Sequence, residues 1–176
     1  EPWHFGKPGD MFYEAICSFI RLRYRLLPYI YATAATVYLR HGTMLRSLMF
    51  DFAHDPNVQD ACHSFMLGGA LLVCPVTEPM YYGPGSTPLC NVAKTKEVYL
   101  PQGTLWYDFW TNRPFAAGQT IPCETPIDRI PVFVKAGSIL PLSQALTYAD
   151  ERQGEVSEIL IYDGADGGFA LYNDAG

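Results

Sequence analysis

One long helical pattern, interrupted by a proline, constrains the fold of this chain more than any other feature. Asp10 is suited to cap a helix over residues 11–41, and Gly42 to end it. Pro28 falls inside, where the missing backbone donor costs about 3 kcal/mol and predicts a kink near residues 24–28. One face of the helix is apolar at a spacing of three to four: Ile16, Ile20, Tyr24, Leu27, Ile30, Tyr31, Ala34 and Tyr38. Because this end of the chain holds no other helix or sheet, we expect the packing partner elsewhere in the chain or outside it.

After the helix the pattern changes to that of short strands. Residues 44–52 alternate as a strand with one buried face, and residues 70–76 form an apolar run typical of a central strand buried on both faces. Between them, Asp55 and Pro56 predict the start of a short helix that ends before Gly69. The inner face of that helix would be Val58, Cys62, Phe65 and Met66.

The rest of the chain predicts an antiparallel sandwich or barrel, with one long exposed excursion at residues 77–95. Its further strands are expected at residues 97–100, 104–110, 120–122, 130–134 and 138–142. Residues 146–156 are polar and suit a linker, after which residues 158–162 and 169–172 flank a Gly-rich turn typical of a hairpin. The expected core is Leu48, Phe50, Leu72, Val98, Trp106, Val132 and Ile139.

Composition narrows the class of protein and its partners. Hydrophobic residues make up 49% and charged residues 17%, which suits a packed globular protein. A net charge of -6 without a basic run argues against nucleic acid and anionic membrane surfaces, and no apolar run approaches the roughly 18 to 20 residues of a membrane span. The chain opens on Glu1 without a Met or a signal peptide, so we interpret it as a piece of a longer protein. The five cysteines leave redox compartment and localisation open.

No catalytic or metal-binding constellation stands out from the spacing of polar residues. The carboxylates Asp51, Asp55, Asp108, Glu124 and Asp128 suit caps, turns and solvated edges better than an acid/base pair. A zinc site from His54, Cys62 and His63 matches no known ligand spacing, and we expect neither metal nor cofactor.

Aromatic side chains offer the remaining candidates for binding. Those of residues 106–110 could stack on sugars, although a strand core is the more ordinary use. The loop residues Trp3, His4 and Phe5 are the candidates for a substrate rim.

Eight blocks of sequence, in this order, resemble glycoside hydrolase family 31. The blocks are EPWHFG (1–6), RLRYRLLPYIY (21–31), GTMLRSL (42–48), FMLG (65–68), LLVCPV (71–76), VYLP (98–101), WYDFW (106–110) and IPVFVKAGSILP (130–141). The resemblance implies a mainly β chain with one long N-terminal helix. Residues 1–43 would be the last loop and helix of a (β/α)8 catalytic barrel, 44–145 a proximal C-terminal β-sandwich, and 146–176 a linker with the first strands of a distal β domain.

The same resemblance implies a function for the longer protein. The family's retaining mechanism uses an Asp nucleophile and an Asp acid/base on α-glucosides or α-xylosides, and neither motif occurs here, so no catalytic residue is assigned. We therefore expect the C-terminal part of an α-glycosidase that releases terminal α-linked glucose or xylose from oligosaccharides, this part supporting the barrel and its rim. The expected partners are the oligosaccharide, bound through the barrel, the upstream part of the same polypeptide, and a second copy by self-association. The alternative is a noncatalytic carbohydrate-binding β-sandwich module.

Overall fold

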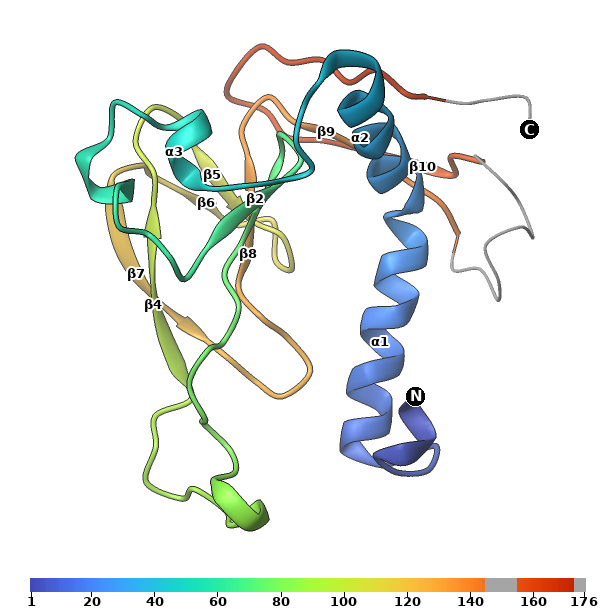
Figure 1. The fold of residues 1–176 in the computed structure, drawn as a ribbon, viewed down its shortest axis with the longest axis vertical. Coiled ribbons are helices and arrows are strands. Elements are labelled where there is room, and N and C mark those ends of the chain that lie inside the picture. The colour runs from blue at the N-terminus through green and yellow to red at the C-terminus, as the bar shows by residue number, and fades with distance from the viewer. Residues whose placement is uncertain (145–154, 173–176) are drawn as a thin grey trace.

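The long helical pattern forms two helices, α1 (Met11–Arg25) and α2 (Leu27–Arg40), in a computed structural model that describes residues 1–144 and 155–172 (Figure 1). The expected kink is present, but the single continuous helix is wrong. Leu26, with φ −79° and ψ 0°, separates the helices, and Pro28 lies in the first turn of α2. That position suits proline because the first turn of a helix does not need its backbone donor. Helix α2 ends on His41 in the left-handed conformation, one residue before the expected Gly42.

Strands make up most of the remaining regular secondary structure, so the expected mainly β class is confirmed. All strand pairings among the described residues are antiparallel. One sheet has six strands in the order β1-β2-β3-β8-β5-β6, and β4-β7 and β9-β10 form two-stranded sheets. The strands are β1 (Leu45–Arg46), β2 (Phe65–Leu67), β3 (Leu71–Val73), β4 (Thr95–Leu100), β5 (Trp106–Asp108), β6 (Pro114–Phe115), β7 (Gln119–Glu124), β8 (Val132–Lys135), β9 (Ile139–Leu142) and β10 (Glu158–Ile161).

The six-stranded sheet is buried on both faces. Neighbouring residues on a strand point to opposite faces, and Leu71 and Leu72 accordingly enter two different hydrophobic clusters. The cluster around Leu71 includes Tyr29 of α2, and the cluster around Leu72 includes Val98 of β4. Helix α2 with β9-β10 therefore covers one face, and the two-stranded β4-β7 sheet covers the other. The continuous apolar run at β3 is explained by this arrangement.

Most of the expected core is buried, with Phe50 as the exception. Phe50 is 73% exposed because the stretch predicted as one strand over residues 44–52 forms only β1 and then the short helix α3 (Leu48–Asp51). The Ser47 hydroxyl caps α3 by accepting a hydrogen bond from the Met49 backbone, at 3.4 Å. Buried as expected are Leu48, Leu72, Val98, Trp106 and Val132, whereas Ile139 is half-buried.

The helix predicted after Asp55 is also wrong beyond its first turn. Asp55 caps a single 3-10 turn, η2 (Pro56–Val58), and the later part of the predicted helix is strand β2. Val58 and Met66 are both buried in one cluster, as their apolar character demanded, but the pairing of β2 with β1 and β3 determines the backbone there. Tertiary pairing has overridden a helical spacing.

The C-terminal segment joins the core instead of forming the expected hairpin. Strand β10 pairs with β9, and residues 169–172 form no strand. Phe169 stacks on Tyr29 of α2, with ring centroids 5.6 Å apart and planes at 27°. Most of the predicted linker, residues 146–156, lies outside the described residues.

The excursion over residues 77–95 projects from the sandwich as expected (Figure 1). It includes the 3-10 turn η3 (Pro84–Ser86). The Lys94 ammonium donates to the carbonyl oxygens of Met80 and of Leu89, the latter at 2.9 Å, and the Tyr81 hydroxyl donates to the Thr125 carbonyl at 2.8 Å. The excursion is therefore held by polar contacts to backbone oxygens at its base.

Candidate functional site

The three predicted rim residues lie together in the 3-10 turn η1 (Pro2–His4) and the residue after it. Trp3, His4 and Phe5 are all exposed, beside the N-terminal end of α1 (Figure 1). His4 Nε2 lies 3.3 Å from the Glu1 carboxylate, and the ring centroids of Trp3 and His4 are 6.2 Å apart. The structure thus brings an aromatic surface together at one end of the molecule. Its role at a substrate rim stays a prediction.

Asp55, one of the weighed carboxylates, has a structural role. Its side chain is buried and accepts hydrogen bonds from the Asn57 backbone (3.0 Å), the Asn57 amide (3.2 Å), the Tyr99 hydroxyl (2.8 Å) and the Gln102 backbone (2.9 Å). Burial by itself raises the pKa of Asp55, but these hydrogen bonds to the charged form lower it more, and the net pKa is below the ordinary value. An ionised, fully bonded carboxylate of this kind does not act as a proton donor near neutral pH.

Two of the other candidate carboxylates, Asp51 and Asp108, also serve local structure. Asp51 forms an ion pair with Arg46 at 2.8 Å, and Asp108 accepts hydrogen bonds from the backbone of Trp110 and Thr111. Glu124, Asp128, His54, Cys62 and His63 are exposed. Within residues 1–144 and 155–172, no group of three or more His, Cys, Asp or Glu side chains is placed to hold a metal ion. In the same part of the chain, no helix is long and apolar enough to cross a membrane.

The aromatic residues of 106–110 pack in the core, the more ordinary of the two uses expected from the sequence. Trp106 is completely buried, and its indole nitrogen donates to the Pro101 carbonyl at 2.9 Å. Trp110 packs edge-on against Phe19 of α1, with ring centroids 6.4 Å apart and planes at 85°. Phe12, near the start of α1, packs against Tyr82 of the excursion, with ring centroids 5.7 Å apart.

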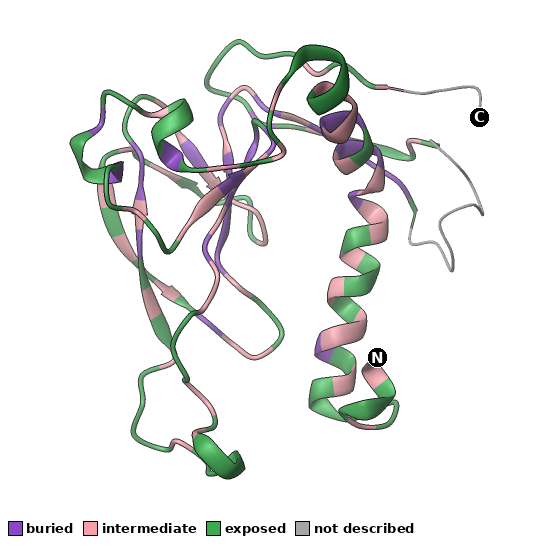
Figure 2. Ribbon diagram, viewed as in Figure 1, coloured by how far each residue is buried: buried purple, intermediate pink, exposed green. Residues whose placement is uncertain are grey.

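Helix α2 has its packing partner within this chain. Its residues Tyr29 and Ala32 are buried on the side of the sandwich, whereas Ala15 is the single buried residue of α1 (Figure 2). Of the two expected alternatives, a partner elsewhere in the chain or one outside it, the first therefore holds for α2. Large apolar side chains remain exposed on both helices: Met11, Phe12, Ile20, Tyr31, Val37, Tyr38 and Leu39. We call this set the exposed helical face.

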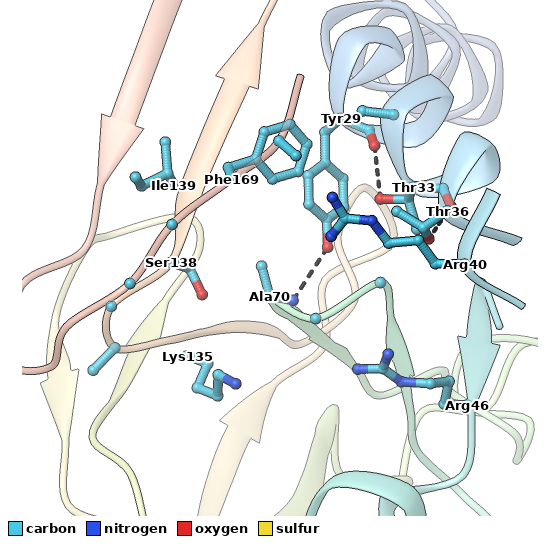
Figure 3. A pocket seen from close by; sticks show the side chains of 18 of the residues that line it. Tyr29, Thr33, Thr36, Arg40, Arg46, Ala70, Lys135, Ser138, Ile139 and Phe169 are labelled. Atoms are coloured by element: carbon cyan, nitrogen blue, oxygen red, sulfur yellow. Dashed lines mark hydrogen bonds between the residues drawn. The ribbon is translucent and has the colours of Figure 1, made fainter. Parts of the chain in front are cut away.

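A pocket of about 400 Å³ lies between α2, the edge of the six-stranded sheet and residues 166–170 (Figure 3). Its cationic side chains come from three separate elements: Arg40 at the end of α2, Arg46 on β1 and Lys135 on β8. Tyr29 forms part of the wall, where its hydroxyl donates to the Leu67 carbonyl at 2.7 Å. No local sequence signal predicted this cluster, because each cation is ordinary in its own segment and only the fold brings the three together.

The structure shows what class of protein this is: a mainly β, antiparallel domain with a pair of helices at its N-terminal end. Its described residues contain no recognisable catalytic group of side chains. Comparison with known proteins then identifies the family. A sequence profile described as the glycosyl hydrolase family 31 C-terminal domain matches residues 41–140, and the chain belongs to this family.

Relatives agree with the profile. An alpha-xylosidase of Saccharolobus solfataricus is 38% identical over the whole chain, which covers 22% of that relative. An alpha-glucosidase of Aspergillus niger is 34% identical over 80% of this chain and 14% of its own length. The crystal structure of a family 31 alpha-xylosidase from Xanthomonas citri matches 99% of this chain and 18% of its own, with a TM-score of 0.85 and 38% identity. The chain thus spans between 14% and 22% of the length of these relatives.

Proposed function

We propose that this chain is the C-terminal part of a retaining α-glycosidase that releases terminal α-linked glucose or xylose from oligosaccharides. Residues 1–43 would be the last loop and helices of a (β/α)8 barrel, and residues 44–145 a proximal sandwich. Residues 146–176 would be a linker and the beginning of a distal β domain, with β10 paired to β9 of the sandwich. Family membership supports this proposal, and favours it over a noncatalytic carbohydrate-binding module. The catalytic carboxylates would be supplied by the upstream part of the same polypeptide.

The exposed helical face is the observation that supports a barrel-supporting role. Tyr38 is 85% exposed and Leu39 and Met11 are also exposed, although α2 itself is held on the sandwich through Tyr29. Burying one large apolar side chain completely contributes about 1.5 to 3 kcal/mol, so covering several of them gives a strong driving force for docking. In the proposed protein the barrel covers this face. In its absence, the same surface drives self-association.

The test separates the upstream part and this chain and then recombines them. We expect no hydrolysis of aryl α-glucoside or α-xyloside by this chain alone, and hydrolysis when the two parts are mixed. Tyr38→Asp should weaken association of the parts, because it places a charge in the apolar contact. Phe50→Asp is the matched control, since Phe50 is 73% exposed and lies on α3, outside the exposed helical face.

Two results would contradict the proposal. Turnover by the purified chain alone would show that it carries its own catalytic groups. Equal loss of association in the Tyr38 and Phe50 variants, measured by sedimentation, would show that the exposed helical face is not the docking surface.

The aromatic turn at the start of the chain would contribute to the substrate rim. Trp3→Ala and Phe5→Ala in the intact enzyme should raise KM while kcat changes little, because stacking on a sugar ring stabilises ground state and transition state alike. Leu45→Ala, an exposed apolar position on β1, is the control and should leave both constants unchanged. Unchanged KM in both aromatic variants would remove these residues from the rim.

A further inference from the structure

The cationic pocket beside α2 has the features of a site for a negatively charged small molecule. We infer that the pocket formed by Arg40, Arg46, Lys135 and Ser138 binds a ligand that carries an oxyanion, either a phosphate or a carboxylate. This site is separate from the proposed hydrolytic function and does not depend on it.

The charge balance of the pocket differs from that of the chain. The protein has a net charge of -6 with 12 Lys and Arg in all, yet three of these cations line one pocket whose acidic lining residue is Asp166. Arg46 is paired with Asp51 through Nε (3.0 Å) and one terminal nitrogen (2.8 Å), which leaves its other terminal nitrogen available. Within the described residues, the side chains of Arg40 and Lys135 have neither an ion pair nor a hydrogen bond.

The three cations line one space. Figure 3 shows the side chains of Lys135 and Arg46 on two sides of the pocket, and that of Arg40 beside Tyr29. An oxyanion bound in this space would accept charge-assisted hydrogen bonds from these side chains.

Ser138 contributes a hydroxyl to the same pocket. The residue is only 8% exposed, it lines the pocket, and its side chain points toward the same space as Lys135 (Figure 3). Its hydroxyl makes no hydrogen bond with any described residue, whereas its backbone nitrogen and oxygen are both bonded. The hydroxyl is open to the pocket, because no buried side-chain nitrogen or oxygen of the described residues lacks a hydrogen-bond partner. It is therefore available to donate to an oxyanion.

The remaining walls set the size and character of the rest of the ligand. A volume of about 400 Å³ falls in the lower part of the usual range for small-molecule sites, roughly 300 to 1,000 Å³. The stacked rings of Tyr29 and Phe169 and the side chain of Ile139 supply apolar surface to the same pocket. Gly137, with φ +76°, allows the backbone of residues 165–166 to approach closely, because an added Cβ would lie 2.8 Å from the Asp166 carbonyl oxygen. The pocket thus suits an anionic head attached to a small ring or carbon chain.

The test measures anion binding to the intact protein by calorimetry, with inorganic phosphate, glucose 1-phosphate and glucuronate as probes and neutral glucose as a control. Lys135→Gln should weaken binding of the phosphate or carboxylate probes by about tenfold or more, since one charge-assisted bond is lost. Ser138→Ala should weaken it by a few-fold. Lys7→Gln removes the same charge at an exposed position outside the pocket and should leave anion affinity unchanged.

The binding measurements distinguish a phosphate ligand, a carboxylate ligand and the absence of an anion site. Tighter binding of glucose 1-phosphate than of glucuronate assigns the head group as phosphate, and the reverse assigns it as carboxylate. Absence of binding by every anion at millimolar concentration would overturn the inference, and so would an affinity that Lys135→Gln and Lys7→Gln reduce equally. Thermal unfolding of each variant shows whether it is folded, and Arg40→Gln, at an exposed helix end, repeats the test should Lys135→Gln unfold. Hydrolysis of aryl α-glycosides without added anion should be the same in all variants, so failure here is distinguishable from failure of the proposed function.

Discussion

Replacing Asp55 tests how one buried carboxylate holds three separate segments together. Its side chain is 3% exposed and joins the turn η2, strand β4 and the turn after β4 through bonds to Asn57, Tyr99 and Gln102. In Asp55→Asn the shape is kept, but one oxygen becomes an amide group that can only donate. The Tyr99 hydroxyl and the Gln102 backbone, which both donate to the same oxygen, Oδ2, would then face a donor or lose their bonds.

The expected loss follows from these bonds. A hydrogen bond to a charged group contributes about 1.5 to 3 kcal/mol, and the two bonds are partly replaced by weaker contacts, so we expect Asp55→Asn to lower the free energy of unfolding by about 3 kcal/mol. A typical total stability is only about 5 to 15 kcal/mol, so the change is large. Asp60→Asn is the control: Asp60 is exposed in the turn that follows η2, and its replacement should cost less than about 0.5 kcal/mol.

The pH dependence of the two proteins gives a second readout. The pKa of Asp55 is lowered in the folded state, where hydrogen bonds outweigh the effect of burial. A carboxylate with a depressed folded pKa stabilises the fold above its unfolded pKa of about 3.9, and this contribution is lost as pH falls toward the folded value. Urea unfolding followed by circular dichroism should therefore show a gap between wild type and Asp55→Asn that is full at about pH 7 and smaller at about pH 3. A gap as small as that of the control, or one that does not change between these pH values, would refute the reasoning.

Three further changes test the packing around α2. Gly68→Ala should lower the free energy of unfolding by about 2 kcal/mol or more, because the residue has a φ of +62° and the added Cβ would clash with the Tyr29 hydroxyl. The control Gly103→Ala, at φ +93° with open space around it, should cost only the backbone strain of about 1 kcal/mol. Equal urea midpoints for the two variants would contradict this. Tyr29→Phe removes a hydroxyl with two hydrogen bonds and should cost about 1 to 2 kcal/mol, and no shift in the midpoint would contradict that. Deleting residues 1–42 should abolish cooperative unfolding in circular dichroism, since it uncovers one face of the sheet; a stable, fully β monomer would show that α2 is dispensable.

The features of the fold that the sequence predicted correctly are those that neighbouring residues determine. Pro28 placed the helix break within one residue or two, because a missing donor and a ring clash act on the adjacent turn whatever the tertiary structure. The apolar run at β3 and the burial of Trp106 were also predictable, since an uninterrupted apolar strand needs cover on both faces. Asp55 was correctly predicted as a cap for the same reason as Pro28: its acceptor lies beside the first backbone donors.

The sequence did not predict the structure where pairing between distant residues decides between two local conformations. Residues 44–52 alternate like a strand, but the Ser47 cap turns them into α3, and Phe50 is thereby exposed. Strand β10 pairs with β9, from which it is separated by 15 residues of sequence, and no turn motif predicted that pairing. The three cations of the pocket are separated by up to 95 positions (40 to 135), so nothing in the order of residues could group them.

The two faces of α2 explain why the apolar face predicted from the sequence, which includes Tyr38 but not Tyr29, is not the face that packs on the sandwich. Tyr29 and Tyr38 are nine positions apart, which at about 100° per residue places them on opposite sides of the helix. Tyr29 is buried against the sandwich, and Tyr38 is 85% exposed. A helix that is apolar on both sides is stable in water only when it lies between two bodies, and the sandwich supplies one of them. Under the proposed function the barrel supplies the other, so α2 would be the element through which the stability of the sandwich and the docking of the barrel are coupled.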